Sequence, residues 1–313
     1  MTARSAMMPF PARLRTELKL DPVLVTLVLM LLLGGFVILA SASITISDNA
    51  TGNPFFYLER QLIAAAIGLA AGAFCLFVPM SVWQSLGFLM LLVGMALLCV
   101  VLVPGIGYEV NGATRWVRFG IMNLQVSEPA RLCLLIYLAG YVVRQQKALR
   151  EQFSGFLRPM LVLSLACALL LAEPDFGAAI VLLATALVVL FVAGARIRDF
   201  ILFFSAAVIA IVALTLTSPY RLNRLTGFMD PWADPYNSGF QLTQSLIAIG
   251  RGEWIGVGLG EGVQKLFYLP EAHTDFVFAV FAEEFGLLGS VVLIAMFVAL
   301  LWRVFKLAMR AAD

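Results

Sequence analysis

Charged residues are scarce in this sequence. They make up 13% of its 313 residues, against about 25% in a soluble domain, and 62% of the residues are hydrophobic. Apolar runs of about 20 residues recur along the chain, and a run of that length crosses a bilayer as a helix. The shortage of charge therefore argues against a soluble enzyme and indicates a helical membrane protein.

Cysteine and histidine are also scarce. The single histidine, His273, has no metal-binding partners near it in the sequence. The cysteines lie inside apolar runs without Cys-x-x-Cys spacing, so we interpret them as small core-filling residues rather than metal ligands or disulfides. They are Cys75, Cys99, Cys133 and Cys167. We expect no cleavable signal peptide, because the first apolar run begins only after Pro22 and is too long for one, so we interpret it as a retained first helix.

The apolar runs predict an all-α polytopic membrane protein with eight transmembrane helices. The expected spans cover residues 23–44, 61–78, 82–103, 126–143, 159–172, 176–193, 200–217 and 286–302. We expect a cytoplasmic tail over residues 1–22 and a single transmembrane domain over residues 23–313. In the second span Ala64, Gly68 and Gly72 recur every four residues, a spacing that favours close helix packing in lipid.

The distribution of charge predicts the orientation. With eight alternating spans, thirteen of the 21 Lys and Arg residues fall on the side shared by both termini, so that side is expected to be cytoplasmic. Fourteen of the 19 Asp and Glu residues fall on the other side. The chemistry is therefore expected in two extracytoplasmic loops, residues 104–125 and residues 218–285.

The second loop is the longest polar stretch. Connections without structure of their own rarely exceed about 15 residues, and its aromatic residues argue against disorder. Ser238 and Gln241 match a capping box, which predicts a helix over residues 239–249. Glycines then alternate at positions 256, 258, 260 and 262. No strand precedes them, so we reject a nucleotide-binding loop and favour close backbone packing or approach of the backbone to a ligand.

The end of this loop holds the candidate catalytic residues. Pro270 can open a helical turn that places Glu271 and Asp275 on one face. Apolar neighbours predict that Asp275 is half-buried, a setting that suits a general base. For His273 we favour a structural hydrogen bond over catalysis. Glu283 and Glu284 stand where the last span is expected to begin, so they either cap that helix or take part in the site.

The first loop offers positive charge. Trp116 fits an interfacial anchor, and Arg115 and Arg118 fit lipid headgroups or a phosphate-bearing substrate. Glu128 and Arg131, three residues apart, either pair with each other or belong to a site, because charges at membrane depth are costly.

A short polar stretch, residues 173–175, separates the fifth and sixth expected spans. Asp175 is explained as the cap of the sixth span. Glu173 has no such explanation.

These residues together resemble the SEDS (shape, elongation, division and sporulation) membrane glycosyltransferases. The matching stretches are residues 111–116 (NGATRW), 125–128 (QVSE), 173–177 (EPDFG), 230–232 (DPW), 244–250 (QSLIAIG) and 264–276 (QKLFYLPEAHTDF). These stretches span nearly the whole chain in the family's order. Their residues are more similar to those of the division branch, FtsW, than to those of the elongation branch, RodA.

Two departures from the family stand out. Its members usually have ten spans, so the chain looks truncated after the eighth. Many relatives have Gln-Pro-Ser-Glu followed by a lysine, where this sequence has Gln125-Val126-Ser127-Glu128 and Arg131.

The resemblance implies polymerisation of lipid II into glycan strands on the outer face of the bacterial cytoplasmic membrane, at the division septum. Asp275 matches the family's catalytic aspartate. Substrate-binding residues are expected among Arg115, Trp116, Arg118, Glu128, Arg131, Lys265, Glu271, His273, Glu283 and Glu284. The positive charges would offset the pyrophosphate, and Glu128, Glu283 and Glu284 would orient these groups or hold a divalent cation such as Mg²⁺.

The implied partners are a class B penicillin-binding protein and other membrane proteins of the division complex, with no nucleic acid. Two alternatives stay open: a lipid II flippase, and a non-catalytic scaffold of that complex. Charges that cluster at one membrane face, rather than at mid-membrane, favour the enzyme over the flippase.

Overall fold

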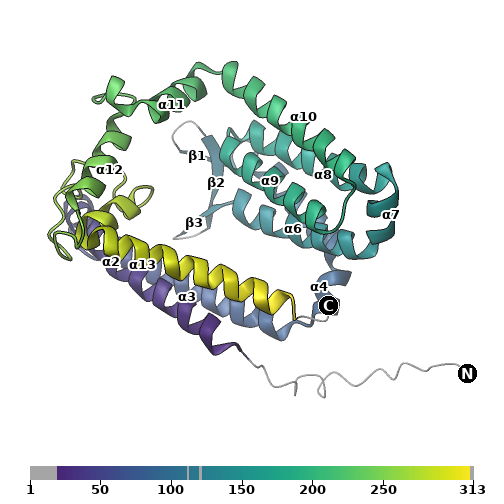
Figure 1. Cartoon of the computed structure of the whole chain (residues 1–313), viewed down its shortest axis with the longest axis horizontal. Coiled ribbons are helices and arrows are strands. Elements are labelled where there is room, and N and C mark those ends of the chain that lie inside the picture. The colour runs from purple at the N-terminus through teal and green to yellow at the C-terminus, as the bar shows by residue number, and fades with distance from the viewer. Residues whose placement is uncertain (1–19, 111–112, 120–121, 311–313) are drawn as a thin grey trace, which may run out of the picture. The chain divides into compact units, whose positions relative to one another are not determined.

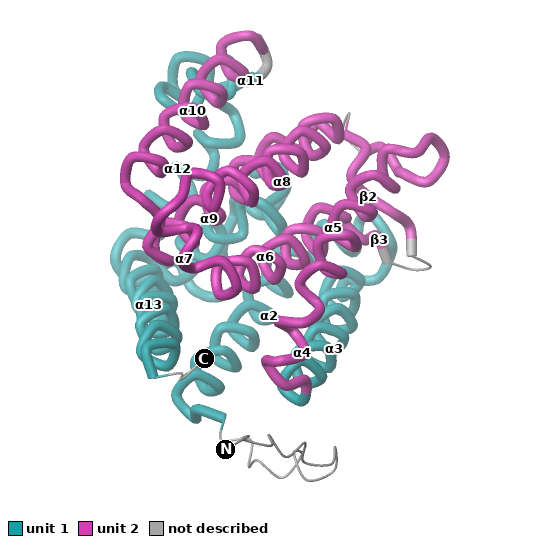
Figure 2. The backbone as a smooth tube through the Cα atoms, turned by 90° about the vertical axis from the view of Figure 1, so that its right-hand side faces the viewer, with its two compact units in different colours: residues 1–77, 220–313 teal, residues 78–219 magenta. Residues whose placement is uncertain are grey.

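The computed structural model describes residues 20–110, 113–119 and 122–310. It is mostly helical, with one small sheet (Figure 1). The chain divides into two compact units, one built from residues 1–77 and 220–313 and the other from residues 78–219 (Figure 2). The expected cytoplasmic tail lies almost wholly outside the described residues.

The first unit joins both ends of the described chain. Its helix α13 packs against α2 and α12, and α2 packs against α3. Its elements are α2 (Pro22–Thr51), α3 (Phe56–Phe77), α11 (Pro219–Met229, of which Tyr220 onward belongs here), the 3₁₀ turn η1 (Pro231–Ala233), α12 (Phe240–Arg251) and α13 (Val277–Ala308).

Helix α2 begins at a clear sequence signal. The Asp21 carboxylate accepts a hydrogen bond from the Leu24 N–H at 2.9 Å, and Pro22 occupies the first helical position. Arg303 of α13 also donates from Nε to Asp21 at 2.9 Å, which lowers the pKa of Asp21 to about 2. Near the other end of α2, Ser41 donates to Glu284. Helices α2 and α13 are therefore antiparallel, with the start of α2 beside the end of α13.

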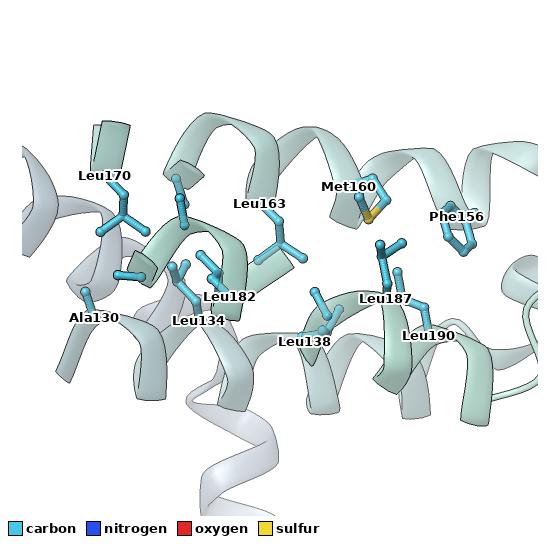
Figure 3. Close-up of a cluster of buried hydrophobic side chains, with 14 of the residues drawn as sticks. Ala130, Leu134, Leu138, Phe156, Met160, Leu163, Leu170, Leu182, Leu187 and Leu190 are labelled. Atoms are coloured by element: carbon cyan, nitrogen blue, oxygen red, sulfur yellow. The ribbon is translucent and has the colours of Figure 1, made fainter. Parts of the chain in front are cut away.

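The second unit is a helical bundle with a sheet. Leucines and small residues from α6, α8 and α9 interlock in its core (Figure 3), where close packing of buried apolar groups is the main stabilising term. Its elements are α4 (Met80–Ser85), α5 (Gly87–Val101), β1 (Tyr108–Val110), β2 (Ala113–Phe119), β3 (Met122–Gln125), α6 (Ser127–Arg144), α7 (Gln146–Glu151), α8 (Phe153–Ala172), α9 (Phe176–Val192) and α10 (Ile197–Leu216).

Five described helices are long and apolar enough to cross a membrane: α2, α3, α8, α10 and α13. Two more, α5 and α9, are apolar but shorter. Many large apolar side chains on these helices are exposed, as expected for surfaces that face lipid. A helix overlaps each of the eight expected spans, but the count of eight crossings stays a prediction.

The first of the two expected loops, residues 104–125, contains a sheet. Its strands β1, β2 and β3 pair antiparallel in that order, with Trp116 opposite both Tyr108 and Gln125. Thr114, Trp116 and Val117 favour strands because β-branched and aromatic side chains suit a pleated surface. The fold is thus helical with a three-stranded sheet.

The second loop is also structured. It holds α11, η1, α12 and the first turns of α13, which begins nine residues before the expected span at Gly286. The expected helix over residues 239–249 is present as α12, but its capping box is wrong. Gly239 is the N-cap, and the Ser238 hydroxyl donates to Asp234 at 3.0 Å instead.

The small-residue stripe of the second span does not pack as expected. Apart from the adjoining residues and backbone of α3 itself, no atom of the described chain lies within 4 Å of a Cβ built on Gly68 or Gly72, and α3 has no buried residue. Close helix packing through this stripe is therefore absent within the described residues.

Candidate functional site

The candidate catalytic residue lies near the C-terminal end of an irregular segment that joins α12 to α13, which we call the 252–276 segment. Asp275 is exposed, two residues before α13 begins. No hydrogen bond or ion pair engages its carboxylate in the described chain. The expectation of half-burial was wrong, but an exposed and unengaged carboxylate is free to meet a substrate.

Glu271 shapes the turn before Asp275. Its carbonyl accepts hydrogen bonds from the N–H groups of Thr274 (3.2 Å) and Phe276 (3.1 Å), and its carboxylate accepts from the Thr274 hydroxyl at 2.7 Å. Its φ of 54° is in the left-handed region, which non-glycine residues seldom adopt. Residues 270–276 form turns rather than the expected helical turn, and Glu271 holds those turns together.

His273 is held by packing. Its ring lies against the ring of Tyr57 on α3, with centroids 4.5 Å apart. Its Nδ1 is buried without a hydrogen-bond partner in the described chain, so the expected structural hydrogen bond is not made through that atom. Burial lowers the pKa of His273, although the charge of Glu271 opposes the shift. Burial therefore favours the neutral form of His273.

Glu283 and Glu284 are buried inside α13, with 0% and 1% of their surfaces exposed. Glu283 accepts hydrogen bonds from the backbone N–H groups of Val263 (3.0 Å) and Gln264 (3.2 Å). Glu284 lies 2.5 Å from the Lys265 ammonium. The interpretation of these glutamates as helix caps is wrong, because both reach sideways and bind the 252–276 segment.

Helix α13 is broken beside these glutamates, and the 252–276 segment fills the break. Gly286 has φ 66° and ψ −165°, so the usual bonds from residues 287 and 288 back to residues 283 and 284 are lost. The freed N–H groups of Leu287 and Leu288 donate to the carbonyls of Glu253 (2.9 Å) and Trp254 (3.0 Å).

The freed carbonyls are satisfied in the same way. The Glu283 carbonyl accepts from the Val257 N–H at 3.0 Å, and the Glu284 carbonyl accepts from the Gly258 N–H at 3.1 Å. Each polar group that the break exposes thus finds a backbone partner, as buried backbone groups require.

Glycine makes this backbone contact possible. A Cβ on Gly256 would lie 2.1 Å from the Glu284 carbonyl oxygen, and one on Gly252 would lie 1.9 Å from the Ala282 oxygen. Close backbone packing was one of the two expectations for the alternating glycines, and it is confirmed at Gly256. Gly260 instead has open space around it and a φ of 89°, so its role there is conformational freedom.

In the second unit, a polar network joins the start of α6 to the start of α9. The Asp175 carboxylate caps α9 by accepting from the Ala178 N–H at 3.1 Å, which confirms the expected cap. It also accepts from the Ser127 hydroxyl at 3.2 Å and the Gln125 amide at 3.4 Å. Arg115 of β2 lies 3.7 Å from the same carboxylate.

The other first-loop candidates have separate contacts. Side chains alternate along a strand, so Trp116 and Arg118 lie on one face of β2 and Arg115 lies on the other. The Arg118 guanidinium sits 3.8 Å above the centre of the Tyr108 ring, a cation–π contact. Glu128 and Arg131 form an ion pair with each other, which confirms that they pair without excluding a place in a site.

Glu173 is the least satisfied carboxylate in the described chain. It is fully buried between α8 and α9, and neither carboxylate oxygen has a hydrogen-bond partner in the described residues. Burial, and then the nearby charge of Asp175, raise the pKa of Glu173 from 4.5 to about 7. The sequence offers no helix cap or ion-pair partner for Glu173, and the structure shows neither in the described residues.

Metal binding finds no support in these contacts. The described residues hold no group of three or more His, Cys, Asp or Glu side chains that could bind an ion. The four cysteines are free, and Cys75 and Cys99 are exposed rather than core-filling. Divalent cations need several free oxygens, whereas Glu283 accepts from two N–H groups and lies 3.8 Å from the Arg251 guanidinium, and Glu284 accepts from Lys265 and Ser41.

A separate cavity of about 350 Å³ lies between α8, α9 and α10. Apart from Ser164 and Cys167 its lining is apolar, so it lacks groups that could orient a reacting sugar. The chemistry is thus better sought among the charged residues.

Sequence reasoning missed two contributors. Ser41 donates to Glu284 at 2.7 Å and accepts from Lys265 at 2.8 Å, and Tyr57 supports His273. Ser41 lies inside an apolar run, where a serine hydroxyl can hydrogen-bond to a neighbouring helix. Tyr57 gave no comparable signal.

Comparisons with known proteins identify the family. The family model FTSW_RODA_SPOVE, described as cell cycle protein, matches residues 22–313. A relative from Thioalkalivibrio sulfidiphilus is 53% identical over 96% of this chain and 75% of its own length, and one from Alkalilimnicola ehrlichii is 57% identical over 86% and 67%. Both are named "Probable peptidoglycan glycosyltransferase FtsW".

Solved structures show the same fold. A chain from a study of how a peptidoglycan synthase complex coordinates polymerization and crosslinking has a TM-score of 0.70 and 30% identity, covering 92% of this chain and 78% of its own length. The rod shape determining protein RodA of Thermus thermophilus has a TM-score of 0.65 and 29% identity, covering 95% and 77%. The protein is therefore a multi-pass helical membrane protein that belongs to the FtsW, RodA and SpoVE family of cell cycle proteins, and it is FtsW-like.

Proposed function

We propose that this protein is a peptidoglycan glycosyltransferase that polymerises lipid II into glycan strands during cell division. The names and high identity of its FtsW relatives support the activity. The observation that carries the mechanism is the exposed carboxylate of Asp275, which has no partner in the described chain and lies at the end of a segment that is otherwise firmly held.

Asp275 acts as the general base. It takes the proton from the 4-hydroxyl of the acceptor sugar as that oxygen attacks the anomeric carbon of the donor. The bond between that carbon and the pyrophosphate oxygen breaks, and undecaprenyl pyrophosphate leaves with the bonding electrons.

Positive charge on the first loop offsets the charge of the leaving pyrophosphate. Arg115 and Arg118 are the best candidates, because the Arg115 guanidinium is oriented by Asp175 and Arg118 is exposed. An arginine can bind two phosphate oxygens at once. Trp116, Glu128, Arg131, Glu271 and His273 contribute to substrate placement in this scheme.

Lys265 is not a candidate for binding the pyrophosphate in this scheme. Only 5% of its surface is exposed and Glu284 binds its ammonium, so it is less suited than the arginines to meet a pyrophosphate. Because Glu283 and Glu284 do not fit a cation site, no step of this mechanism passes through a metal.

The setting follows from the same proposal. The protein sits in the cytoplasmic membrane at the septum, with both termini in the cytoplasm and Asp275 outside, beside a class B penicillin-binding protein. The contact between Asp21 and Arg303 supports termini on one side, since it brings the start of α2 to the end of α13. Asp275 lies at the opposite end of α13. A structural neighbour from a synthase complex supports the partner.

The decisive experiment is polymerisation of lipid II by purified protein in detergent, with the penicillin-binding partner present. We expect Asp275→Asn to reduce polymer formation by roughly 10²-fold or more, because loss of a general base costs about 10²–10⁴-fold. Glu261→Gln, an exposed carboxylate of the same segment, is the matched control and should keep full activity.

Other outcomes separate the alternatives. Polymer made by Asp275→Asn at the wild-type rate overturns the general-base role. Wild-type protein that moves lipid II across vesicles but makes no polymer indicates a flippase. A strain that divides normally on Asp275→Asn protein indicates a scaffold.

A further inference from the structure

Four residues from three elements form a polar cluster that we call the carboxylate clamp: the half-buried Ser41 of α2, and the buried Lys265 of the 252–276 segment and Glu283 and Glu284 of α13. The Lys265 ammonium donates hydrogen bonds to the Glu284 carboxylate (2.5 Å) and the Ser41 hydroxyl (2.8 Å). The Ser41 hydroxyl in turn donates to Glu284 (2.7 Å). Glu283 binds the two residues before Lys265 through their backbone N–H groups.

Stability alone is a weak reason for such a cluster. Removing charges from water costs free energy, and an apolar replacement of a buried ion pair is often neutral or stabilising. What a hydrogen-bonded ion pair adds is a fixed geometry, because each donor must meet its acceptor at one distance and angle. The clamp therefore fixes where residues 263–265 lie relative to α2 and α13.

The position of Asp275 depends on that fixed point. Between Lys265 and Asp275, the segment is anchored again by Leu269 and Ala272, which are 1% and 0% exposed in an apolar cluster with Ile38 and Val280. Apolar contacts of this kind do not specify direction. The clamp supplies the directional restraint, and Asp275 projects into solvent from a segment restrained at both points.

We propose that Ser41, Lys265, Glu283 and Glu284 are positioning residues, which act on the reaction by holding the segment that presents Asp275. This inference rests on the proposed general-base role of Asp275. A base placed about 1 Å from its working position loses roughly 100-fold in rate, so loosening the clamp lowers kcat while the substrate contacts, and hence KM, change little.

The test uses a graded set of variants in the lipid II polymerisation assay. We expect Glu284→Gln to lower kcat roughly 10- to 100-fold and Ser41→Ala to lower it roughly 3- to 10-fold, each with KM within about threefold of wild type. Ser43→Ala is the matched control: Ser43 is buried on the same helix, but its hydroxyl has no hydrogen-bond partner in the described chain. It should leave kcat unchanged.

Glu284→Gln leaves the Lys265 charge buried without its partner, and the variant can fail to fold for that reason. The double variant Lys265→Gln with Glu284→Gln avoids the problem, since it buries two neutral amides. We expect this variant to melt close to the wild-type temperature, yet to show the lowered kcat. Hydrogen exchange in peptides covering residues 263–276 should be faster than in wild type.

Each remaining outcome decides the matter. Wild-type kcat and wild-type exchange in the folded double variant overturn the inference. A raised KM with unchanged kcat also overturns it, because the clamp would then be a binding site. If Asp275→Asn is fully active, the proposed base is wrong, but faster exchange still shows that the clamp restrains the segment.

Discussion

At the scale of single residues, two carboxylates have opposite surroundings. Asp275 is exposed and unengaged, which suits a group that must exchange protons with a substrate. Glu173 is fully buried with both oxygens unpaired in the described chain, and its pKa is raised to about 7. Burial without partners disfavours the charged form, so Glu173 is protonated in acid and becomes an unpaired buried charge in base.

Glu173 therefore predicts a dependence of stability on pH. Its folded pKa lies above its ordinary value of 4.5, so the folded state binds the extra proton between about pH 4.5 and pH 7, and stability falls as pH rises through that range. We expect Glu173→Gln to lose this dependence and to be more stable than wild type at about pH 8.5, by up to about 3 kcal/mol.

Apparent melting temperatures in detergent, taken from about pH 5 to about pH 8.5, check this prediction. Glu261→Gln, which changes an exposed carboxylate, should keep the wild-type dependence. A wild-type melting temperature that stays level or rises with pH across this range would contradict the assignment.

The sequence predicted residue identity better than residue surroundings. The sequence identifies Asp275, Glu283 and Glu284 as candidates. It predicts a half-buried Asp275 that is in fact exposed, and it does not predict that Glu283 and Glu284 are buried. Burial in a membrane protein depends on which helix covers a residue, and Glu284 is covered by α2, more than 200 residues away in the chain. The Asp175 cap was predicted correctly because it is a local interaction within α9.

At the scale of elements, the break in α13 sets the shape of the site. The 252–276 segment replaces two helical hydrogen bonds of α13, and glycines at positions 252, 256 and 286 allow the backbones to meet. The sequence of the apolar run does not predict this break, because a single glycine such as Gly286 is common in transmembrane helices.

Gly256→Ala tests this element. Its φ is 81°, and the new Cβ would lie 2.1 Å from the Glu284 carbonyl oxygen. The left-handed backbone alone costs about 1–2 kcal/mol for a side-chain-bearing residue, and the clash adds to it. We expect destabilisation of roughly 2–4 kcal/mol and reduced polymerisation, measured by melting in detergent and by the lipid II assay.

Gly250→Ala is the control for that change. Gly250 lies in α12 with open space around its built Cβ, and alanine is the better helix former, so stability should be unchanged or slightly higher. Equal stability of the two variants would show that the close backbone contact is dispensable.

The sheet of the first loop was the element most plainly missed. Asn-Gly between two short runs of strand-forming residues is a hairpin signal, and Asn111-Gly112 supplies it in the sequence. The strands have only three, seven and four residues, so the alternation of their side chains gives a weak signal. The helices were easier to predict, since each is a long apolar run.

At the scale of the whole molecule, the charge pattern predicts one orientation. The contact of Asp21 with Arg303 brings the start of α2 and the end of α13 to one side, and the 252–276 segment lies at the other end of α13. We expect that a cysteine at position 261, in a background without native cysteines, reacts with a membrane-impermeant maleimide added to intact spheroplasts.

A cysteine at position 147, in the basic loop assigned to the cytoplasm, is the matched control and should react only after lysis. Both sites are exposed. Reaction at position 147 but not at position 261 in intact cells would reverse the orientation and remove the proposed active face from the lipid II that is polymerised outside.

The pairing of α2 with α13 also determines when the first unit is completed during synthesis. Asp21 and Arg303 are 282 residues apart, and at about 5–20 residues per second the ribosome needs roughly 15–60 seconds to make the intervening chain. The second unit lies entirely within that interval. The first described helix must therefore wait until the last described helix is made before Ser41 can meet Lys265 and Glu284.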